Sequence, residues 1–240
     1  GADIILVFDE CTPFNVDKKY TATSMQRSHR WAQRSLNSFN NKNSFLPSFG
    51  SSGMQKIYGI IQGGIYDDLR EESIEYNLNN IDVFGIAIGG SLGSTKSEMY
   101  KIVDFVGKKL DLKHPVHLLG IGDPKDIWNL VKAGIDTFDC VSPTRLARHG
   151  SALTRSKVGK ININNSSYAT NYNSIDIECN CETCSNYSLS YIHHLFKTNE
   201  LIGLNLLTVH NIFFMNNLMQ IIRRAIEVDK LDEEERNWYI

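Results

Sequence analysis

Three cysteines crowd into one short segment of the chain, in the pattern Cys179-x-Cys181-x-x-Cys184. This spacing can bring three thiolates together from one tight turn, and a fourth ligand would complete the tetrahedron that zinc prefers. The candidates for that ligand are His193, His194 and His210. The chain has five cysteines, an odd number, and three of them lie within six residues. They are not distributed along the chain as in the disulfide framework of a secreted protein. The pattern therefore predicts a structural metal site filled by four protein ligands.

Polar or small residues follow five short apolar runs. They are Asp9, Gln62-Gly63-Gly64, Gly89-Gly90, Gly120-Ile121-Gly122 and Asp139-Cys140. Taken singly, an aspartate can cap a helix and a glycine can serve a turn. Five such positions in succession favour one shared pocket at the carboxyl ends of the strands, where barrel enzymes place their sites.

A segment with two arginines three residues apart follows Asp139, and it contains Arg145, Arg148 and His149. We interpret it as a loop. Arginine binds phosphates and base edges through two parallel hydrogen bonds, so this segment suits a nucleic-acid substrate. The formal net charge of −2 provides no general attraction for a polyanion, so such a site has to be a local cluster.

Alternating strands and helices must position these residues. We expect strands at 3–9, 57–62, 83–88, 116–121 and 135–140, and helices near 22–39, 66–79, 95–109 and 125–133. Such alternation indicates a parallel sheet built from βα units. An open doubly wound sheet and a (βα)8 barrel without its first three units both fit five strands. Because the chain begins with Gly1 and a strand follows at once, we expect that an N-terminal part is missing.

The alternation stops after Asp139. A polar, asparagine-rich stretch at 161–176 precedes the cysteines, and two helices are expected near 186–199 and 211–228. We therefore expect a catalytic barrel domain at 1–160 and a zinc-binding subdomain with C-terminal helices at 161–240. With 42% apolar and 22% charged residues the chain is ordinary globular material. It contains no apolar run of the ~20 residues that a membrane span needs, so we expect a cytoplasmic protein.

The motifs resemble, in order, those of the tRNA-guanine transglycosylases, which exchange a guanine in tRNA for a 7-deazaguanine. They are Phe8-Asp9-Glu10-Cys11-Thr12-Pro13, Gln62-Gly63-Gly64, Ile88-Gly89-Gly90, Gly134-Ile135-Asp136-Thr137-Phe138-Asp139-Cys140, Pro143-Thr144-Arg145, Arg148-x-Gly150, the cysteine cluster, Tyr191-Ile192-His193-His194 and His210-Asn211. The resemblance extends over essentially the whole chain. It implies an α/β fold, a (βα)8 TIM barrel truncated at its N-terminus with about five units present.

The resemblance also implies roles for individual residues. Asp139 corresponds to the nucleophile, which forms a covalent ribosyl-aspartate as guanine leaves the wobble position of the anticodon loop. Base recognition falls to Asp9, Gln62, Gly89 and Gly90, with Cys11 and Leu119 lining the same pocket. Arg145 and Arg148 correspond to residues that bind the anticodon loop. Cys179, Cys181, Cys184 and His210 correspond to the ligands of one structural zinc ion, which leaves His193 and His194 to pack helices.

The expected partners are tRNA, a free 7-deazaguanine (preQ1 or queuine) and a second copy of the chain in a homodimer. Two features depart from the family pattern. Neither its acid/base aspartate nor the aromatic residue that stacks on the base can be assigned here, and the Gly90–Ser94 loop is shorter and lacks an acid. Two other interpretations stay open: a non-catalytic transglycosylase-like subunit that binds tRNA, and an unrelated barrel enzyme that acts on a small molecule.

Overall fold

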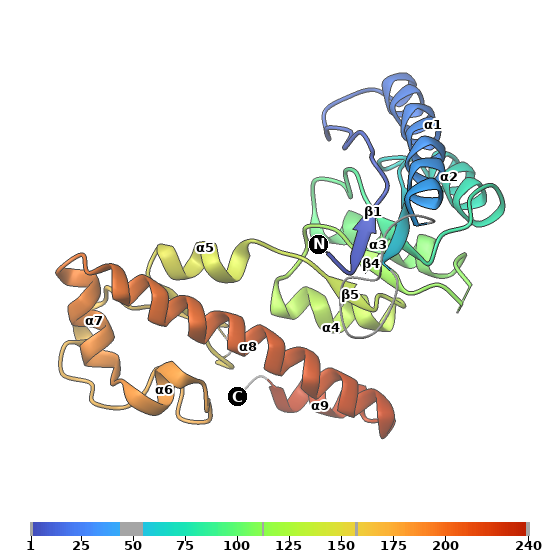
Figure 1. The fold of residues 1–240 in the computed structure, drawn as a ribbon. Helices are drawn as coiled ribbons and strands as arrows, with labels where there is room; N and C mark the ends of the chain where they lie inside the picture. Colours follow the sequence, from blue (N-terminus) through green and yellow to red (C-terminus); the bar gives the residue numbers. More distant parts are fainter. Residues whose placement is uncertain (1, 44–54, 112, 157, 239–240) are drawn as a thin grey trace. The chain divides into compact units, whose positions relative to one another are not determined.

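The structure, a computed structural model, describes residues 2–43, 55–111, 113–156 and 158–238 (Figure 1). The chain divides into two compact units. We call the first, residues 1–121 and 129–139, the barrel unit, and the second, residues 122–128 and 140–240, the helical unit. The domain division at 160/161 stays a prediction, and its outer limits Gly1 and Ile240 lie outside the described residues.

The barrel unit contains a parallel five-stranded sheet. Its elements in chain order are β1 (Ile4–Leu6), α1 (Lys18–Asn43), β2 (Lys56–Ile61), α2 (Asp67–Asn79), β3 (Gly85–Ile88), α3 (Lys96–Gly107), β4 (Val116–Leu118), the second half of α4 (Pro124–Lys132) and β5 (Thr137–Phe138). The first half of α4, residues 124–128, belongs to the helical unit. The spatial order β1-β2-β3-β4-β5 follows the chain without a reversal. A doubly wound sheet would reverse its strand order at a switch point. The sheet is therefore a half-barrel, as the family resemblance implied.

The core of the barrel unit lies between the sheet and its helices, where α1 packs against α2 and α2 against α3. Ile61, Ile86, Ile88, Leu118 and Val103 are fully buried there. Near-continuous apolar strands of this kind are typical of parallel sheets.

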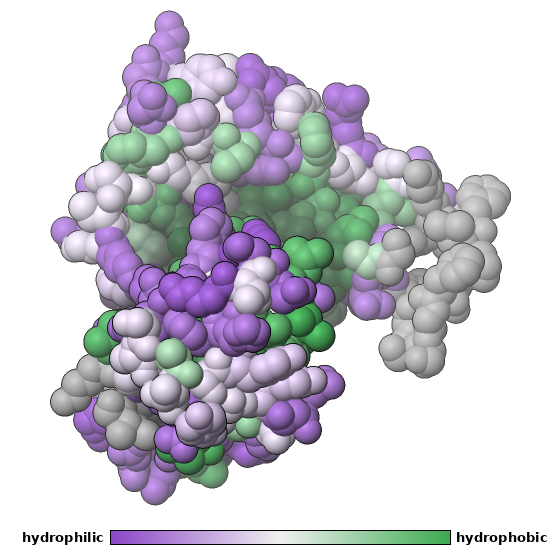
Figure 2. Space-filling model, turned by 90° about the vertical axis from the view of Figure 1, so that its left-hand side faces the viewer, coloured by the Kyte–Doolittle hydropathy of each residue, from purple (hydrophilic) through white to green (hydrophobic). Residues whose placement is uncertain are grey.

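Apolar side chains are also exposed beside β1, where Leu6 is 39% and Phe8 68% exposed. A groove of about 900 Å³ runs along β1 and α1. Figure 2 shows that apolar surface gathers in a hollow rimmed by polar side chains. Apolar surface of this kind usually contacts another part of a protein.

Local signals explain where helices α3 and α4 begin. Thr95 caps α3, accepting a hydrogen bond from the backbone N–H of Glu98, whose carboxylate accepts from the N–H of Thr95 in return. This reciprocal capping box satisfies two N–H groups that would otherwise lack partners. Pro124 opens α4, since its missing N–H costs nothing at the first helical position.

The helical unit is organised around one long helix. Its elements are α5 (Ser142–Arg148), β6 (Ser151–Leu153), β7 (Lys160–Asn162), the 3-10 turn η1 (Ser166–Tyr168), α6 (Glu182–Asn186), α7 (Leu189–Lys197), α8 (Leu201–Glu227) and α9 (Leu231–Trp238). Helices α5, α6, α7 and α9 and strand β6 all pack against α8 (Figure 1). No helix in the described part of the chain is long and apolar enough to cross a membrane.

Two sequence-based assignments in this unit were wrong. The arginine segment is helix α5, not a loop, and Pro143 stands in its first turn, where proline is favoured. Helix α8 begins at Leu201, ten residues before the expected start at 211, so His210 lies within it. Gly203 and Asn205 weaken the helical pattern over the first turns, and packing against neighbouring elements decides the structure there.

The asparagine-rich stretch forms turns. Asn162, Asn165 and Asn171 each accept a hydrogen bond from the backbone N–H two residues further on. These Asx turns explain why asparagine recurs in this connection between β7 and the cysteines.

Candidate functional site

The strand-end residues of the barrel unit come together at one edge of the sheet. Gln62 follows β2, Gly89 follows β3, Leu119 follows β4 and Asp139 follows β5, and Asp9 lies in the segment after β1. Parallel strands in register end at the same level, so these residues share one rim. That they form one shared pocket stays a prediction.

Asp9 and Gln62 are joined by a direct hydrogen bond. The Nε2 of Gln62 donates to Oδ2 of Asp9 across 2.5 Å. Burial raises the pKa of the Asp9 carboxyl, and the bond from Gln62 opposes that rise. Gln62 is fully buried, and its Oε1 has no partner among the described residues. An unpaired buried oxygen beside a carboxylate is suited to a ligand that donates hydrogen bonds.

Glycine is required beside Gln62 because the space there is narrow. A Cβ atom on Gly89 would lie 3.1 Å from Nε2 of Gln62 and 3.4 Å from Cδ1 of Leu119. A Cβ on Gly90 would lie 2.4 Å from Oε1 of Gln62, and the φ of Gly90 is +71°. The two glycines thus let the backbone after β3 lie close to Gln62 and Leu119, and we call the surroundings of these four residues the slot.

The buried guanidinium of Arg70, in α2, ties the loops of this slot together. Arg70 is 0% exposed. It donates to the backbone carbonyls of Ile61 at the end of β2 and Gly64 after it, and to those of Gly89 and Ser91 after β3, at 2.8 to 3.1 Å. Burial lowers its pKa to about 10, so it remains charged at neutral pH. Sequence reasoning missed Arg70; the signal was a polar residue on the face of α2 that faces the sheet.

A series of buried contacts from helices α2 and α1 supports the backbone of Gln62. The backbone N–H of Gln62 donates to Oγ of Ser73, which lies 3.1 Å from Nε2 of His29. The His29 ring stacks on Tyr76 with centroids 4.1 Å apart. Burial lowers the pKa of His29 to about 4, so the ring is neutral at neutral pH. The sequence analysis did not single out these residues.

Helix α1 holds the segment that carries Asp9 and Cys11. Oγ of Ser28 accepts from the N–H of Glu10 at 3.0 Å, and the hydroxyls of Thr12 and Ser24 lie 2.7 Å apart. The side chain of Cys11 is exposed in this structure.

Asp139 presents its carboxylate at the end of β5, and its side chain is 57% exposed. Its Oδ1 accepts from the backbone N–H of Gly120 at 2.9 Å and lies 3.2 Å from Nε2 of His117. An exposed, oriented carboxylate can act as a nucleophile or as a base. Sequence reasoning found Asp139 and missed His117, which no motif singled out.

Arg145 and Arg148 both lie in α5, in the helical unit, and both are exposed. They stand in the last turn of the helix, three residues apart, so they lie on neighbouring positions of one face. The helix therefore places the two arginine side chains side by side, as a pair of nucleic-acid contacts would require.

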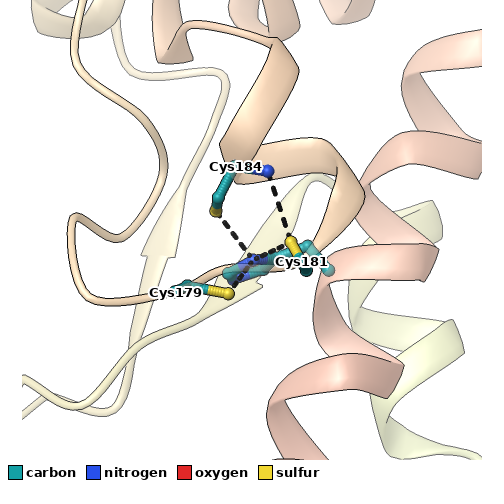
Figure 3. A group of neighbouring side chains, drawn as sticks. Cys179, Cys181 and Cys184 are labelled. Carbon is teal, nitrogen blue, oxygen red and sulfur yellow. Dashed lines mark hydrogen bonds between the residues drawn. The ribbon is translucent and has the colours of Figure 1, made fainter.

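The three cysteines and His210 form one cluster in the helical unit (Figure 3). Nδ1 of His210 lies 3.7, 3.6 and 3.3 Å from the sulfur atoms of Cys179, Cys181 and Cys184. Tetrahedral zinc with ordinary Zn–S and Zn–N bonds has S···N edges of about 3.5 Å. The four ligand atoms thus already have the spacing of a structural metal site.

Local structure delivers each of these ligands. Cys181 caps α6 and Cys184 lies within it, whereas His210 comes from the middle of α8. Nε2 of His210 donates to the carbonyl oxygen of Leu153 at 2.9 Å, which leaves Nδ1 free to bind a metal. The pKa of the Cys184 thiol is raised by its hydrogen bonds with Cys179 and Cys181. Sulfur atoms this close cannot all ionise unless a cation compensates their charge.

The two other histidine candidates lie outside the cluster. His193 is buried, and its Nδ1 lies 2.7 Å from the carbonyl oxygen of Ile163. His194, on the same helix, is exposed. The helix-packing role that the resemblance implied for the pair fits His193.

Known proteins resemble the chain over its whole length. A family profile described as queuine tRNA-ribosyltransferase matches residues 1–240. The chain is 44% identical over 229 residues to the queuine tRNA-ribosyltransferase of Roseiflexus sp. (strain RS-1), a match that covers 94% of this chain and 57% of that protein. It is 41% identical over 240 residues to that of Thermoanaerobacter sp. (strain X514), covering 100% and 60%. It is 39% identical to that of Aliivibrio fischeri (strain MJ11), covering 100% and 61%. The chain thus spans about 60% of the length of these curated relatives.

Proposed function

The chain belongs to the queuine tRNA-ribosyltransferase family, and on this basis we propose that the protein exchanges a guanine in the tRNA anticodon loop, at the wobble position, for a 7-deazaguanine. The observation that carries the proposal is the rim of the half-barrel. There an exposed carboxylate, Asp139, follows β5 in register with the slot between Gln62 and Leu119.

The slot would bind the base. Asp9 accepts hydrogen bonds from the adjacent N–H groups on the edge of guanine, an edge that 7-deazaguanines share. Gln62 and the backbone beside Gly90 bind the neighbouring polar atoms, and Leu119 contacts the ring. Cys11 completes the wall. Burial of Asp9 favours a ligand that brings N–H donors, because an ionised carboxylate out of water needs them.

Asp139 would perform the exchange. Its carboxylate attacks C1′ of the ribose, the bond from C1′ to N9 of guanine breaks, and guanine leaves with the electron pair and takes up a proton. The resulting ribosyl-aspartate is opened by the incoming base, which returns the carboxylate. Preformed contacts from Gly120 and His117 to Asp139 support this role, since they orient the carboxylate before substrate arrives.

The helical unit would supply RNA contacts and a structural metal. Arg145 and Arg148 are exposed on α5 and can bind the phosphates or bases of the anticodon loop. The donor set of three thiolates and one imidazole, with its S···N spacing, favours zinc. Because all four positions are protein ligands, the metal would stabilise the fold and take no part in the exchange.

We also propose that two copies associate through the helical unit. Exposed apolar side chains on α8 support this, among them Ile202, Val209 and Ile212. Sedimentation velocity should show a dimer that Ile212→Lys dissociates. A monomer of the unaltered protein would refute this part alone.

The central test is the covalent intermediate. When the full-length protein is mixed with tRNA and no incoming base is added, an adduct that survives denaturation should form, and Asp139→Asn should abolish it. Asp9→Asn should mainly weaken base binding, because Asp9 faces the base and not the sugar. An adduct that persists in Asp139→Asn would show that another residue is the nucleophile. A protein that binds tRNA but forms no adduct would be the non-catalytic subunit instead.

A further inference from the structure

One imidazole contacts the proposed nucleophile, and the sheet register places it there. His117 of β4 and Thr137 of β5 are paired residues in adjacent strands. Asp139 lies two residues beyond Thr137, so its side chain is on the same face of the sheet. His117, Thr137 and Asp139 therefore form a compact group on one face, next to Leu119 at the rim.

Hydrogen bonding defines how the group is protonated. Nε2 of His117 lies 3.2 Å from Oδ1 of Asp139, and Nδ1 lies 2.8 Å from Oγ1 of Thr137. An ionised carboxylate can only accept, so Nε2 carries the hydrogen that points at Asp139. In the neutral ring, Nδ1 then accepts the hydroxyl proton of Thr137. Asp139 thus fixes the ring tautomer, and Thr137 supplies the matching donor to Nδ1.

The two oxygen atoms of Asp139 have different surroundings. Oδ1 receives two N–H groups, from Gly120 at 2.9 Å and from His117. Within the described residues, no hydrogen bond is assigned to Oδ2, and the side chain is 57% exposed. On the premise of the proposed function, we propose that Oδ2 is the attacking oxygen and that His117 is a positioning residue that binds Oδ1 through both halves of the exchange.

The consequence for the reaction follows from charge. When Oδ2 bonds to C1′, the C1′–N9 bond breaks, its electron pair leaves with guanine, and guanine is protonated by water or an acid. Oδ1 becomes the carbonyl oxygen of a neutral ester. In the second half, N9 of the incoming base bonds to C1′, loses its proton to water or a base, and the Oδ2–C1′ electron pair returns to Asp139. Hydrogen bonds to a carboxylate are about twice as strong as those to a neutral carbonyl. His117 therefore favours release of the carboxylate and should accelerate breakdown of the adduct more than its formation.

The experiment measures that breakdown directly. The adduct is accumulated on the full-length protein with tRNA, guanine is added as the incoming base, and the decay of the adduct is followed in a single turnover. His117→Phe, which keeps a ring and removes the N–H donor, should slow the decay about tenfold. His117→Gln, which keeps a donor, should stay within about threefold of the wild-type rate. The concentration of guanine at half-maximal rate should change little, because His117 does not contact the base.

The matched control is His114→Phe. His114 precedes β4 and is paired with Asp111 at 2.7 Å, so its loss should not affect the decay. Should His117→Phe fail to fold, Thr137→Val takes its place. It removes the hydroxyl that donates to Nδ1 of His117 and holds the ring in place, and it should slow the decay about threefold.

The outcomes separate the two proposals. If the wild type forms no adduct, or Asp139→Asn still forms one, the proposed function fails and the inference with it. If the adduct depends on Asp139 but decays at the wild-type rate in His117→Phe, or in Thr137→Val where that replaces it, only the inference on His117 is overturned. Equal slowing by His117→Phe and His117→Gln would also overturn it, since the N–H donor that glutamine keeps would then give no advantage.

Discussion

Replacing Arg70 by methionine should loosen the slot without unfolding the helical unit. Methionine has a similar length but no donors, so the four carbonyl groups that Arg70 binds lose that partner. The carbonyl of Ile61 retains a bond from the N–H of Gly89 at 3.0 Å. The other three carbonyl oxygens, those of Gly64, Gly89 and Ser91, have no second donor among the described residues and would be left unpaired.

The size of the effect follows from those three groups. A buried acceptor without its donor costs about 1–3 kcal/mol. The lower end of that range, about 1 kcal/mol or slightly more for each group, applies, because methionine avoids dehydrating a guanidinium whose pKa burial lowers to about 10. We expect the free energy of unfolding to fall by about 3–4 kcal/mol. Arg70→Lys should recover less than half of it, because one ammonium group cannot reach both loops as a planar guanidinium does.

Urea denaturation followed by circular dichroism would measure the stability, and amide hydrogen exchange would localise the loss to the segments around Gly64 and Gly89. Zinc content reports on the helical unit and should not change. Arg30→Met is the matched control: Arg30 is exposed on α1 and binds only a carbonyl of its own helix, that of Gln26. It should cost less than about 0.5 kcal/mol. If Arg70→Met unfolds within 1 kcal/mol of the wild type, an estimate built from unpaired carbonyls is refuted.

Three further results are expected. Gly90→Ala and Gly134→Ala both place alanine at a positive φ, +71° and +92°, and each should cost about 1 kcal/mol of stability. Only Gly90→Ala, whose Cβ would meet Gln62, should also weaken the binding of a 7-deazaguanine measured by calorimetry. Equal affinities of the two variants would refute the proposal that the base binds beside Gln62. The folded-state pKa of His29, about 4, lies below its ordinary value of 6.5. Its contribution to the free energy of unfolding is therefore complete above pH 6.5 and falls by up to about 3 kcal/mol as the pH drops to 4. His29→Phe should lose this part of the acid sensitivity in urea titrations at pH 7 and 4.5. An unchanged pH dependence in His29→Phe would show that His29 does not cause it. His210→Ala should hold less than one zinc per chain by elemental analysis and expose α6 to hydrogen exchange, whereas His194→Ala should hold one; the reverse pattern would mean that His210 is not the fourth ligand.

Local patterns were enough to predict the strands of the barrel unit, whereas the family resemblance was needed to choose a barrel over a doubly wound sheet. Apolar runs with small or polar residues behind them predicted each of the five strands, and the strand ends predicted Asp9, Gln62 and Asp139 at one rim. This succeeds because parallel strands joined by helices leave their carboxyl ends on one side. Short elements of the helical unit were harder. The seven residues of α5 and the first turns of α8 are helical because they pack on neighbouring elements, and no local period reports that.

The metal site shows where local spacing stops being sufficient. The thiolates of Cys179, Cys181 and Cys184 were predicted by their spacing alone, because one short turn carries all three. Spacing could not choose among three histidines, since the fourth ligand comes from a different helix. The family resemblance pointed to His210, and the approach of α8 to α6 brings that residue to the sulfur atoms.

The sequence by itself determined the five parallel strands, the residues at their carboxyl ends and three of the four metal ligands, because each of these depends on a period or a spacing within one segment. The choice of a half-barrel over a doubly wound sheet came from the family resemblance and from the strand order in the structure. Tertiary structure alone decided which side chains serve those residues. Arg70 reaches two loops at once, and His117 meets Asp139 only because β4 and β5 pair in the register that sets His117 opposite Thr137. Such contacts join residues far apart in the chain, and their geometry follows from strand register and helix packing, which no single segment encodes.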